Sequence, residues 1–421
     1  MVKKNNLRAW GVGISAMVIA AVSTLPVMVL PIFVVPLSEN LNSTIGNISL
    51  VISLVSLGAI LSLLLFGKIT SKVPLKLLAI IGGLVILGFL LIMGVTTSIL
   101  PLYIAAFCMG FFGVFAGGPM AQIVISQWFI KARGTLISLI MVIASALGAA
   151  IVSVFANLLQ TFTYGQIVIW FGVIIALVVI VLALLFIGGT PESKGLKPYG
   201  FEEAPSDGGG QESAVSMSGG VNLSLSQIYK IPVFWFVILI PILATIAITS
   251  FGSQAANFNM SIGLSEVDSG YALSIRMIAG MVWSLLFGVI SDKKNPSVAM
   301  FVTSIAAAVI CFTIFLWQGW VGAIICAISF SGANCMAIFG PITLPKLFGM
   351  KEAGSMIGFA NAASGIGAFI GPAVAGFLFD VNKNYNFIYT IMGVLVIICI
   401  VIGFWVGSKK NAETIRLKAE S

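Results

Sequence analysis

Arg276 is a charged residue inside a long apolar segment, residues 268–294 (DSGYALSIRMIAGMVWSLLFGVISDKK). No other charged residue lies well inside an apolar segment of this chain. A charge at the centre of a bilayer costs at least about 2.5–3.5 kcal/mol on insertion scales, so such a residue marks a functional site by default. A guanidinium is a planar fork that binds a carboxylate through two parallel hydrogen bonds. The sequence therefore predicts an anion site at Arg276.

One positive charge suits one carboxylate. A dianion would leave its second charge unpaired in a low-dielectric interior, so a monoanion is favoured. The alternative is that Arg276 extends outward along its helix, because it lies only about two turns from the outer end. There it would pair with an acidic residue near that face: Glu39, Glu266, Asp268 or Asp380.

The composition predicts the elements that position this residue. Of the 421 residues, 59% are hydrophobic and 8% are charged, and the mean hydropathy is +1.15. A bilayer needs apolar runs of about 20 residues, whereas a soluble core cannot hide so many apolar side chains. The chain therefore predicts an all-α membrane protein with twelve spans. They are residues 10–37, 47–66, 76–96, 100–127, 135–159, 165–188, 231–255, 269–290, 298–317, 320–344, 354–379 and 387–407.

The basic residues predict the orientation. All of the 21 Lys and Arg residues except Arg276 and Lys383 fall in the tails, the middle segment and the loops of one face. By the positive-inside rule this face, with both termini, is cytoplasmic. The net charge of +8 follows the same pattern, so it indicates membrane topology rather than a nucleic-acid partner.

Two halves are predicted. Residues 1–188 form an N-terminal six-helix bundle and residues 231–407 a C-terminal one. Residues 189–230, rich in Gly, Ser, Pro and acids, are a flexible cytoplasmic linker, and residues 408–421 are a cytoplasmic tail. GKITSK at 67–72 and GVISDK at 288–293 lie 221 residues apart, which indicates a parallel repeat of two pseudo-symmetric bundles.

The twelve spans, the long central linker and above all the loop at 288–293 resemble those of the major facilitator superfamily. Residues 191–200 (PESKGLKPYG) are similar to a stretch found in its oxalate/formate antiporter-like and monocarboxylate transporter-like members. So are residues 36–41 (PLSENL) and the pair Trp128-Phe129. The resemblance covers the whole chain and implies a carrier that works by alternating access.

The chain departs from that group in three places. Trp283 stands where members commonly have the arginine of the eighth helix, and Arg276 lies seven residues earlier on about the same face. Residues 358–371 (GFANAASGIGAFIG) lack the lysine of the oxalate carrier's eleventh helix. Ser71 replaces the usual aspartate of the first-half loop, which removes one expected contact between the halves.

The resemblance also implies that the first, fourth, seventh and tenth helices line a substrate cavity. The uncharged polar residues predicted to bind substrate beside Arg276 are Gln122, Ser250, Gln254, Asn334 and Asn361, with Trp283 as a wall. The alternative for each polar residue is a hydrogen bond between packed helices, worth about 0.6 kcal/mol. Aromatic residues such as Trp283 alternatively face lipid or fill a core.

Nothing in the sequence indicates enzymatic chemistry. There is no phosphate-binding loop, GxSxG, HExxH or histidine, and the five cysteines lie in apolar spans without metal-ligand spacing. We therefore expect no enzyme, no cofactor and no metal site. Because no predicted span holds a titratable carboxylate or histidine, we expect exchange, uniport or proton symport in which the substrate carries the proton.

The combined prediction is a monomeric carrier of a small organic anion, most simply a monocarboxylate, in the cytoplasmic membrane, with lipid as its other partner. Contacts between the halves are expected from Asp292, Lys293, Lys72 and Arg133. The alternatives are efflux of hydrophobic or cationic compounds and, less favoured, a membrane sensor that does not transport.

Overall fold

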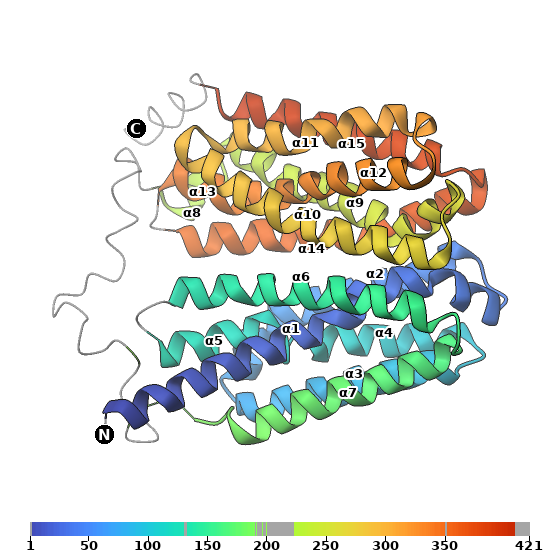
Figure 1. Cartoon of the computed structure of the whole chain (residues 1–421). Helices are drawn as coiled ribbons and strands as arrows, with labels where there is room; N and C mark the ends of the chain where they lie inside the picture. The colour runs from blue at the N-terminus through green and yellow to red at the C-terminus, as the bar shows by residue number, and fades with distance from the viewer. Residues whose placement is uncertain are drawn as a thin grey trace. The chain divides into compact units, whose positions relative to one another are not determined.

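A computed structural model describes residues 2–129, 133–189, 191, 196, 199, 223–349 and 352–408. The chain divides into two compact units, Met1–Ser206 and Asp207–Ser421. Each unit is a bundle of long helices, as Figure 1 shows.

In its described residues the first unit has seven helices, of which the fourth and fifth are the two parts of one span. They are α1 (Val2–Asn40), α2 (Ile45–Thr70), α3 (Leu75–Val95), α4 (Ile99–Gly113), α5 (Gly118–Trp128), α6 (Arg133–Leu158) and α7 (Tyr164–Leu185).

The second unit repeats this plan after a short helix. Its elements are α8 (Leu225–Ile228), α9 (Pro232–Ser261), α10 (Glu266–Lys293), α11 (Pro296–Thr313), the 3-10 turn η4 (Ile314–Leu316), α12 (Gly319–Ala333), the 3-10 turn η5 (Asn334–Ile338), α13 (Phe339–Phe348), α14 (Ala353–Asn382) and α15 (Tyr385–Val406).

The twelve-helix membrane fold is confirmed. Among the described residues, 11 helices are long and apolar enough to cross a membrane, and α6 contributes the shorter apolar stretch Val142–Leu158. Four boundaries differ by more than a turn. The first helix begins at Val2 instead of residue 10, and the second and tenth spans each end four residues later than predicted, at Thr70 and Phe348. The seventh span was predicted to end at residue 255, but α9 continues to Ser261 and includes the buried polar residues Asn257 and Asn259.

The sequence did not predict that two spans are interrupted. In the fourth, α4 ends at Gly113, and α5 starts at Gly118 with Pro119 in its first turn. Proline lacks the amide hydrogen that a helix interior needs and fits the first turn of a new helix. In the tenth, the 3-10 turn η5 separates α12 from α13. The two breaks lie at matching places of the two halves, about 221 residues apart.

Small residues set the closest helix contacts of each bundle. A Cβ on Gly110 of α4 would meet the carbonyl oxygen of Val55 in α2. In the second unit, a Cβ on Gly371 of α14 would lie 2.7 Å from the carbonyl oxygen of Ile246 in α9. Only glycine lets the backbones approach this closely.

The predicted linker, 189–230, is anchored near both ends. The backbone N–H of Tyr199 donates to the carbonyl of Trp128 (2.8 Å), and the Tyr199 ring lies 5.7 Å from that of Phe129. At the other end, the N–H of Leu223 donates to the carbonyl of Phe348 (3.4 Å). Residues 200–222 and the predicted tail from residue 409 lie outside the described residues.

Candidate functional site

Helix α10 holds Arg276. Its N-terminus is capped by Ser265, whose hydroxyl oxygen accepts the N–H of Asp268 (3.1 Å). Two side chains tie α10 to α12. Trp283 Nε1 donates to the carbonyl of Ile328 (2.8 Å). Ser331 Oγ lies within hydrogen-bonding distance of the carbonyl of Arg276 (2.7 Å) and of the carbonyl of Ala327 in its own helix (2.6 Å), so these two carbonyls share its one proton. The backbone at Arg276 is therefore fixed, and its side chain emerges from a rigid element.

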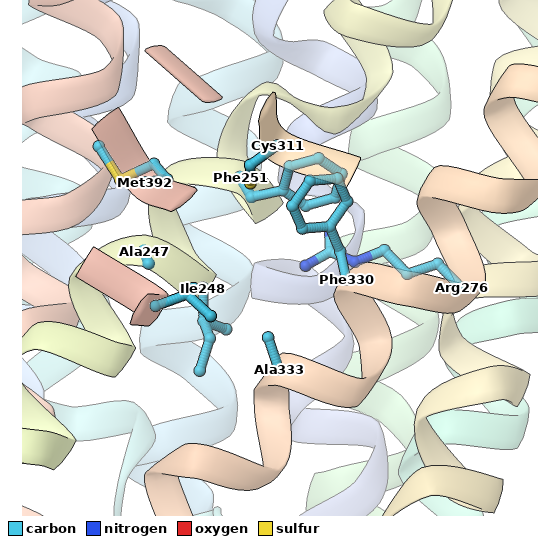
Figure 2. A pocket seen from close by; sticks show the side chains of 9 residues that line it. Ala247, Ile248, Phe251, Arg276, Cys311, Phe330, Ala333 and Met392 are labelled. Carbon is cyan, nitrogen blue, oxygen red and sulfur yellow. The ribbon is translucent and has the colours of Figure 1, made fainter. Parts of the chain in front are cut away.

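The side chain of Arg276 turns into the second bundle. Its guanidinium carbon lies 4.7 Å from the ring centroid of Phe251 on α9. The Phe251 ring stacks on that of Phe330 from α12, with centroids 3.6 Å apart. Figure 2 shows Arg276 reaching from its helix toward these two rings. A cation over an aromatic face gains about 0.5–2 kcal/mol, depending on how far it is desolvated.

A small pocket adjoins Arg276, which is the charged residue among the described side chains that line it (Figure 2). The other lining side chains are apolar or carry a thiol and come from α9, α11, α12 and α15. They are Ala247, Ile248, Phe251, Cys311, Phe330, Ala333, Met392 and Val396. All of them belong to the second unit.

Among the described residues, no carboxylate and no hydrogen-bond acceptor reaches the guanidinium. Asp268 accepts the hydroxyl proton of its neighbour Ser265 (2.8 Å), and Asp380 lies 3.8 Å from Lys383. The outward pairing considered for Arg276 is therefore not the conformation observed. The guanidinium donors are unpaired in the described part of the chain, and a charge left without a partner is costly. The adjoining pocket has a volume of about 10 Å³, space for about one water molecule, so an anion would enter only when the surrounding side chains move apart.

Two predicted site residues of α9 lie inside the second bundle. Ser250 Oγ donates to the carbonyl of Gly371 in α14 (2.8 Å), so its proton serves a contact between helices. Gln254 is fully buried, and its Oε1 accepts Asn257 Nδ2 (3.1 Å). The bond of Ser250 joins two packed helices, as the structural alternative described, whereas that of Gln254 lies within α9.

The other predicted residues have different settings. Asn334 begins η5, and its buried Oδ1 has no hydrogen-bond partner among the described residues. Trp283 uses its indole N–H in the bond to Ile328. Gln122 on α5 and Asn361 on α14 are exposed on their respective units.

Of the predicted contacts between the halves, Lys72 and Lys293 have exposed side chains. The side chains of Asp292 and Arg133 lie outside the described part of the structure. Among the described residues no group of acids or cysteines is arranged to hold a metal ion.

Phe251 and Phe330 were not predicted as site residues. Ser250, next to Phe251, was predicted because it is polar within a span, whereas a phenylalanine in a span gives no signal of its own. Only the packing of α9 against α12 brings the two rings together beside Arg276.

The fold is that of a multi-pass helical membrane protein, and its second half contains a pocket lined by the charged residue Arg276. The family model of the Major Facilitator Superfamily matches residues 12–345, and the chain belongs to this superfamily of transporters.

Relatives give less detail. The chain is similar to monocarboxylate transporter 14 of Homo sapiens, with 28% identity over 139 residues, or 32% of this chain and 27% of the relative. The protein of the same name from Mus musculus is 26% identical over 136 residues, 31% of this chain and 26% of the relative. The matched segment thus spans about a quarter of each relative's length.

Among solved structures, the chain resembles the nucleoside transporter NupG, with a TM-score of 0.70, 14% identity, and coverage of 95% of this chain and 99% of the other. A D323A mutant of NupG gives 0.69 and 12%, with coverage of 97% and 99%. At this level of identity the likeness shows the fold alone.

Proposed function

We propose that this protein is a carrier of a small organic monoanion, most simply a monocarboxylate, that works by alternating access. The observation that carries the proposal is the guanidinium of Arg276, which borders a pocket and meets no acid among the described residues. A charge in this position needs an anionic partner, and a carboxylate matches its geometry.

Two further observations support the substrate class. The pocket around Arg276 is otherwise apolar, so it offers no second positive group for a dianion. The partial similarity to monocarboxylate transporter 14 points the same way. Gln122, Gln254, Asn334 and Asn361 remain proposed contacts with the substrate.

The proposal includes a topology and a mode of action. The basic loops support a topology with both termini in the cytoplasm and a carrier in the cytoplasmic membrane. The carrier acts as a monomer by exchange, by uniport or by symport in which the substrate brings its proton, and it performs no enzymatic step. Lys72, Arg133, Asp292 and Lys293 are proposed to form contacts between the halves.

The test compares wild type with Arg276→Gln. In proteoliposomes, wild type is expected to take up labelled butyrate, and butyrate is expected to raise the unfolding midpoint of the purified protein, because a ligand stabilises the state that it binds. Arg276→Gln should lose both effects and keep its fold. Lys383→Gln removes a charge from an exposed side chain (68% exposed) and should behave as wild type.

The alternative, efflux of hydrophobic or cationic compounds, has one observation in its favour, the stacked rings of Phe251 and Phe330 in the pocket. A guanidinium on the same rings repels cations. If lipophilic cations stabilise wild type and Arg276→Gln equally, and butyrate stabilises neither, the exporter replaces the monoanion carrier.

A further inference from the structure

A second polar group lies on α15, the helix that lines part of the pocket with Met392 and Val396. Tyr389 is fully buried, and its hydroxyl finds no hydrogen-bond partner among the described residues. An unpaired buried hydroxyl costs about 1–3 kcal/mol. A phenylalanine would fill the same volume without that cost, so the hydroxyl calls for a partner outside the described chain.

The ring of Tyr389 belongs to the aromatic group that carries Arg276. Its centroid lies 4.8 Å from that of Phe251 and 5.8 Å from that of Phe330. Phe251 is the ring under the guanidinium. Packing against Phe258, with centroids 4.7 Å apart, fixes the orientation of the tyrosine further.

Met392 and Val396, one and two turns after Tyr389 on α15, line the pocket. Two unsatisfied polar groups, from α10 and α15, thus flank the same pair of stacked rings, and the remaining pocket wall offers no polar oxygen or nitrogen side chain.

We propose that Tyr389 is a second anchor of the ligand, whose hydroxyl donates to the carboxylate that Arg276 binds. The inference rests on the proposed function and deepens it. One carboxylate oxygen pairs with the guanidinium and the other accepts the phenol proton, while the rest of the ligand faces Phe330, Met392 and Val396. The site therefore favours a monocarboxylate with a short apolar chain over a dicarboxylate or a neutral amide.

The experiment measures dissociation constants of purified wild type and Tyr389→Phe for butyrate, for butyramide as its neutral analogue and for succinate as a dianion. Wild type should bind butyrate and neither of the others. Tyr389→Phe should weaken butyrate binding by about tenfold, the loss of one hydrogen bond to a charged group.

Stability without ligand separates a binding role from a structural one. Since the hydroxyl has no partner among the described residues, Tyr389→Phe should leave the unfolding midpoint of the free protein unchanged or raise it. Tyr385→Phe is the matched control, one turn earlier on α15. Tyr385 stacks on Phe379, with centroids 4.4 Å apart, and its variant should keep the wild-type affinity for butyrate.

The outcomes distinguish the two proposals. If wild type binds butyrate, Arg276→Gln does not, and Tyr389→Phe binds as tightly as wild type, the second anchor is overturned and the proposed function stands. A lower midpoint of free Tyr389→Phe with unchanged affinity also overturns it, because the hydroxyl is then a structural group. If wild type binds no monocarboxylate, the proposed function fails first.

Discussion

The same helix crossing occurs once in each half of this protein, and the two copies are built differently. In the first half, α2 meets α4 where the carbonyl of Val55 lies against Gly110. In the second half, α10 meets α12 where the carbonyl of Arg276 accepts the hydroxyl of Ser331 (2.7 Å). Both pairs are related by 221 residues, so Arg276 corresponds to Val55 and Ser331 to Gly110.

The first crossing is closed and the second leaves room. No Cβ fits at Gly110, whereas a Cβ on Gly280 of α10 would have its nearest neighbours at 3.9 and 4.0 Å, in Asn334 and Ser331. The wider spacing admits a hydroxyl between α10 and α12.

The two halves also differ in the polar side chains that they bury. Among the described residues, the buried polar side chains of the first half are all serines, whereas those of the second half include amides. The interior of the first bundle is therefore mostly apolar, whereas the interior of the second bundle holds the larger polar groups. The comparison teaches that a repeat can keep its helix geometry while only one copy carries the charged site.

The largest expected effect comes from giving the second crossing the residue of the first. Arg276→Val should weaken butyrate binding by about a hundredfold or more, because the carboxylate loses its charged partner. The unfolding midpoint of the free protein should be unchanged or higher, since the variant removes a half-buried charge that has no partner among the described residues. Butyrate titration and thermal unfolding measure the two effects. A lower midpoint with intact binding would make Arg276 a structural residue.

The reverse exchange should act on stability alone. Gly110→Ser forces a side chain into the carbonyl of Val55 and should cost about 1–3 kcal/mol, as overpacking does. Gly113→Ser on the same helix is the control, because a Cβ there has only the side chain of Ile86 nearby, at 3.9 Å. Thermal unfolding of the two variants should differ clearly. Equal midpoints would show that the first crossing is not closed.

The smallest effect is expected from the hydroxyl of the second crossing. Ser331→Ala removes one bond between helices, worth about 0.6 kcal/mol. Its butyrate affinity should change by about threefold at most, since that energy sets the limit on any displacement of Arg276. Ser364→Ala is a suitable control, because Ser364 bonds the carbonyl of Ala360 in its own helix (3.2 Å). A loss of binding as large as that of Arg276→Val would mean that Ser331 itself contacts the ligand.

Much of the fold was predictable from local composition. Long apolar runs predict spans, and each predicted span corresponds to a helix or to one interrupted helix. The interruptions themselves were missed, although Gly117, Gly118 and Pro119 mark the first one, because hydropathy averaged over a span does not register a turn inside it. The contacts of the predicted flexible linker were not foreseen: Tyr199 and Leu223 bond to the ends of α5 and α13.

Of the candidate site, only the charged residue was predictable from the sequence. Arg276 is conspicuous in the sequence because a charge inside an apolar segment is costly wherever it lies. Ser250 and Gln254 looked equally available as contacts. Only the packing of α9 against α14 shows that the hydroxyl of Ser250 donates to the carbonyl of Gly371.

The sequence by itself determined that the chain is a twelve-helix membrane protein with one charge to place, because hydrophobicity and the cost of a buried charge are properties of single segments. The tertiary structure alone decided where that charge points. The direction of Arg276 depends on which helices pack around α10, and the rings of Phe251, Phe330 and Tyr389, which are far apart in the sequence, meet beside it only after α9, α12 and α15 have assembled.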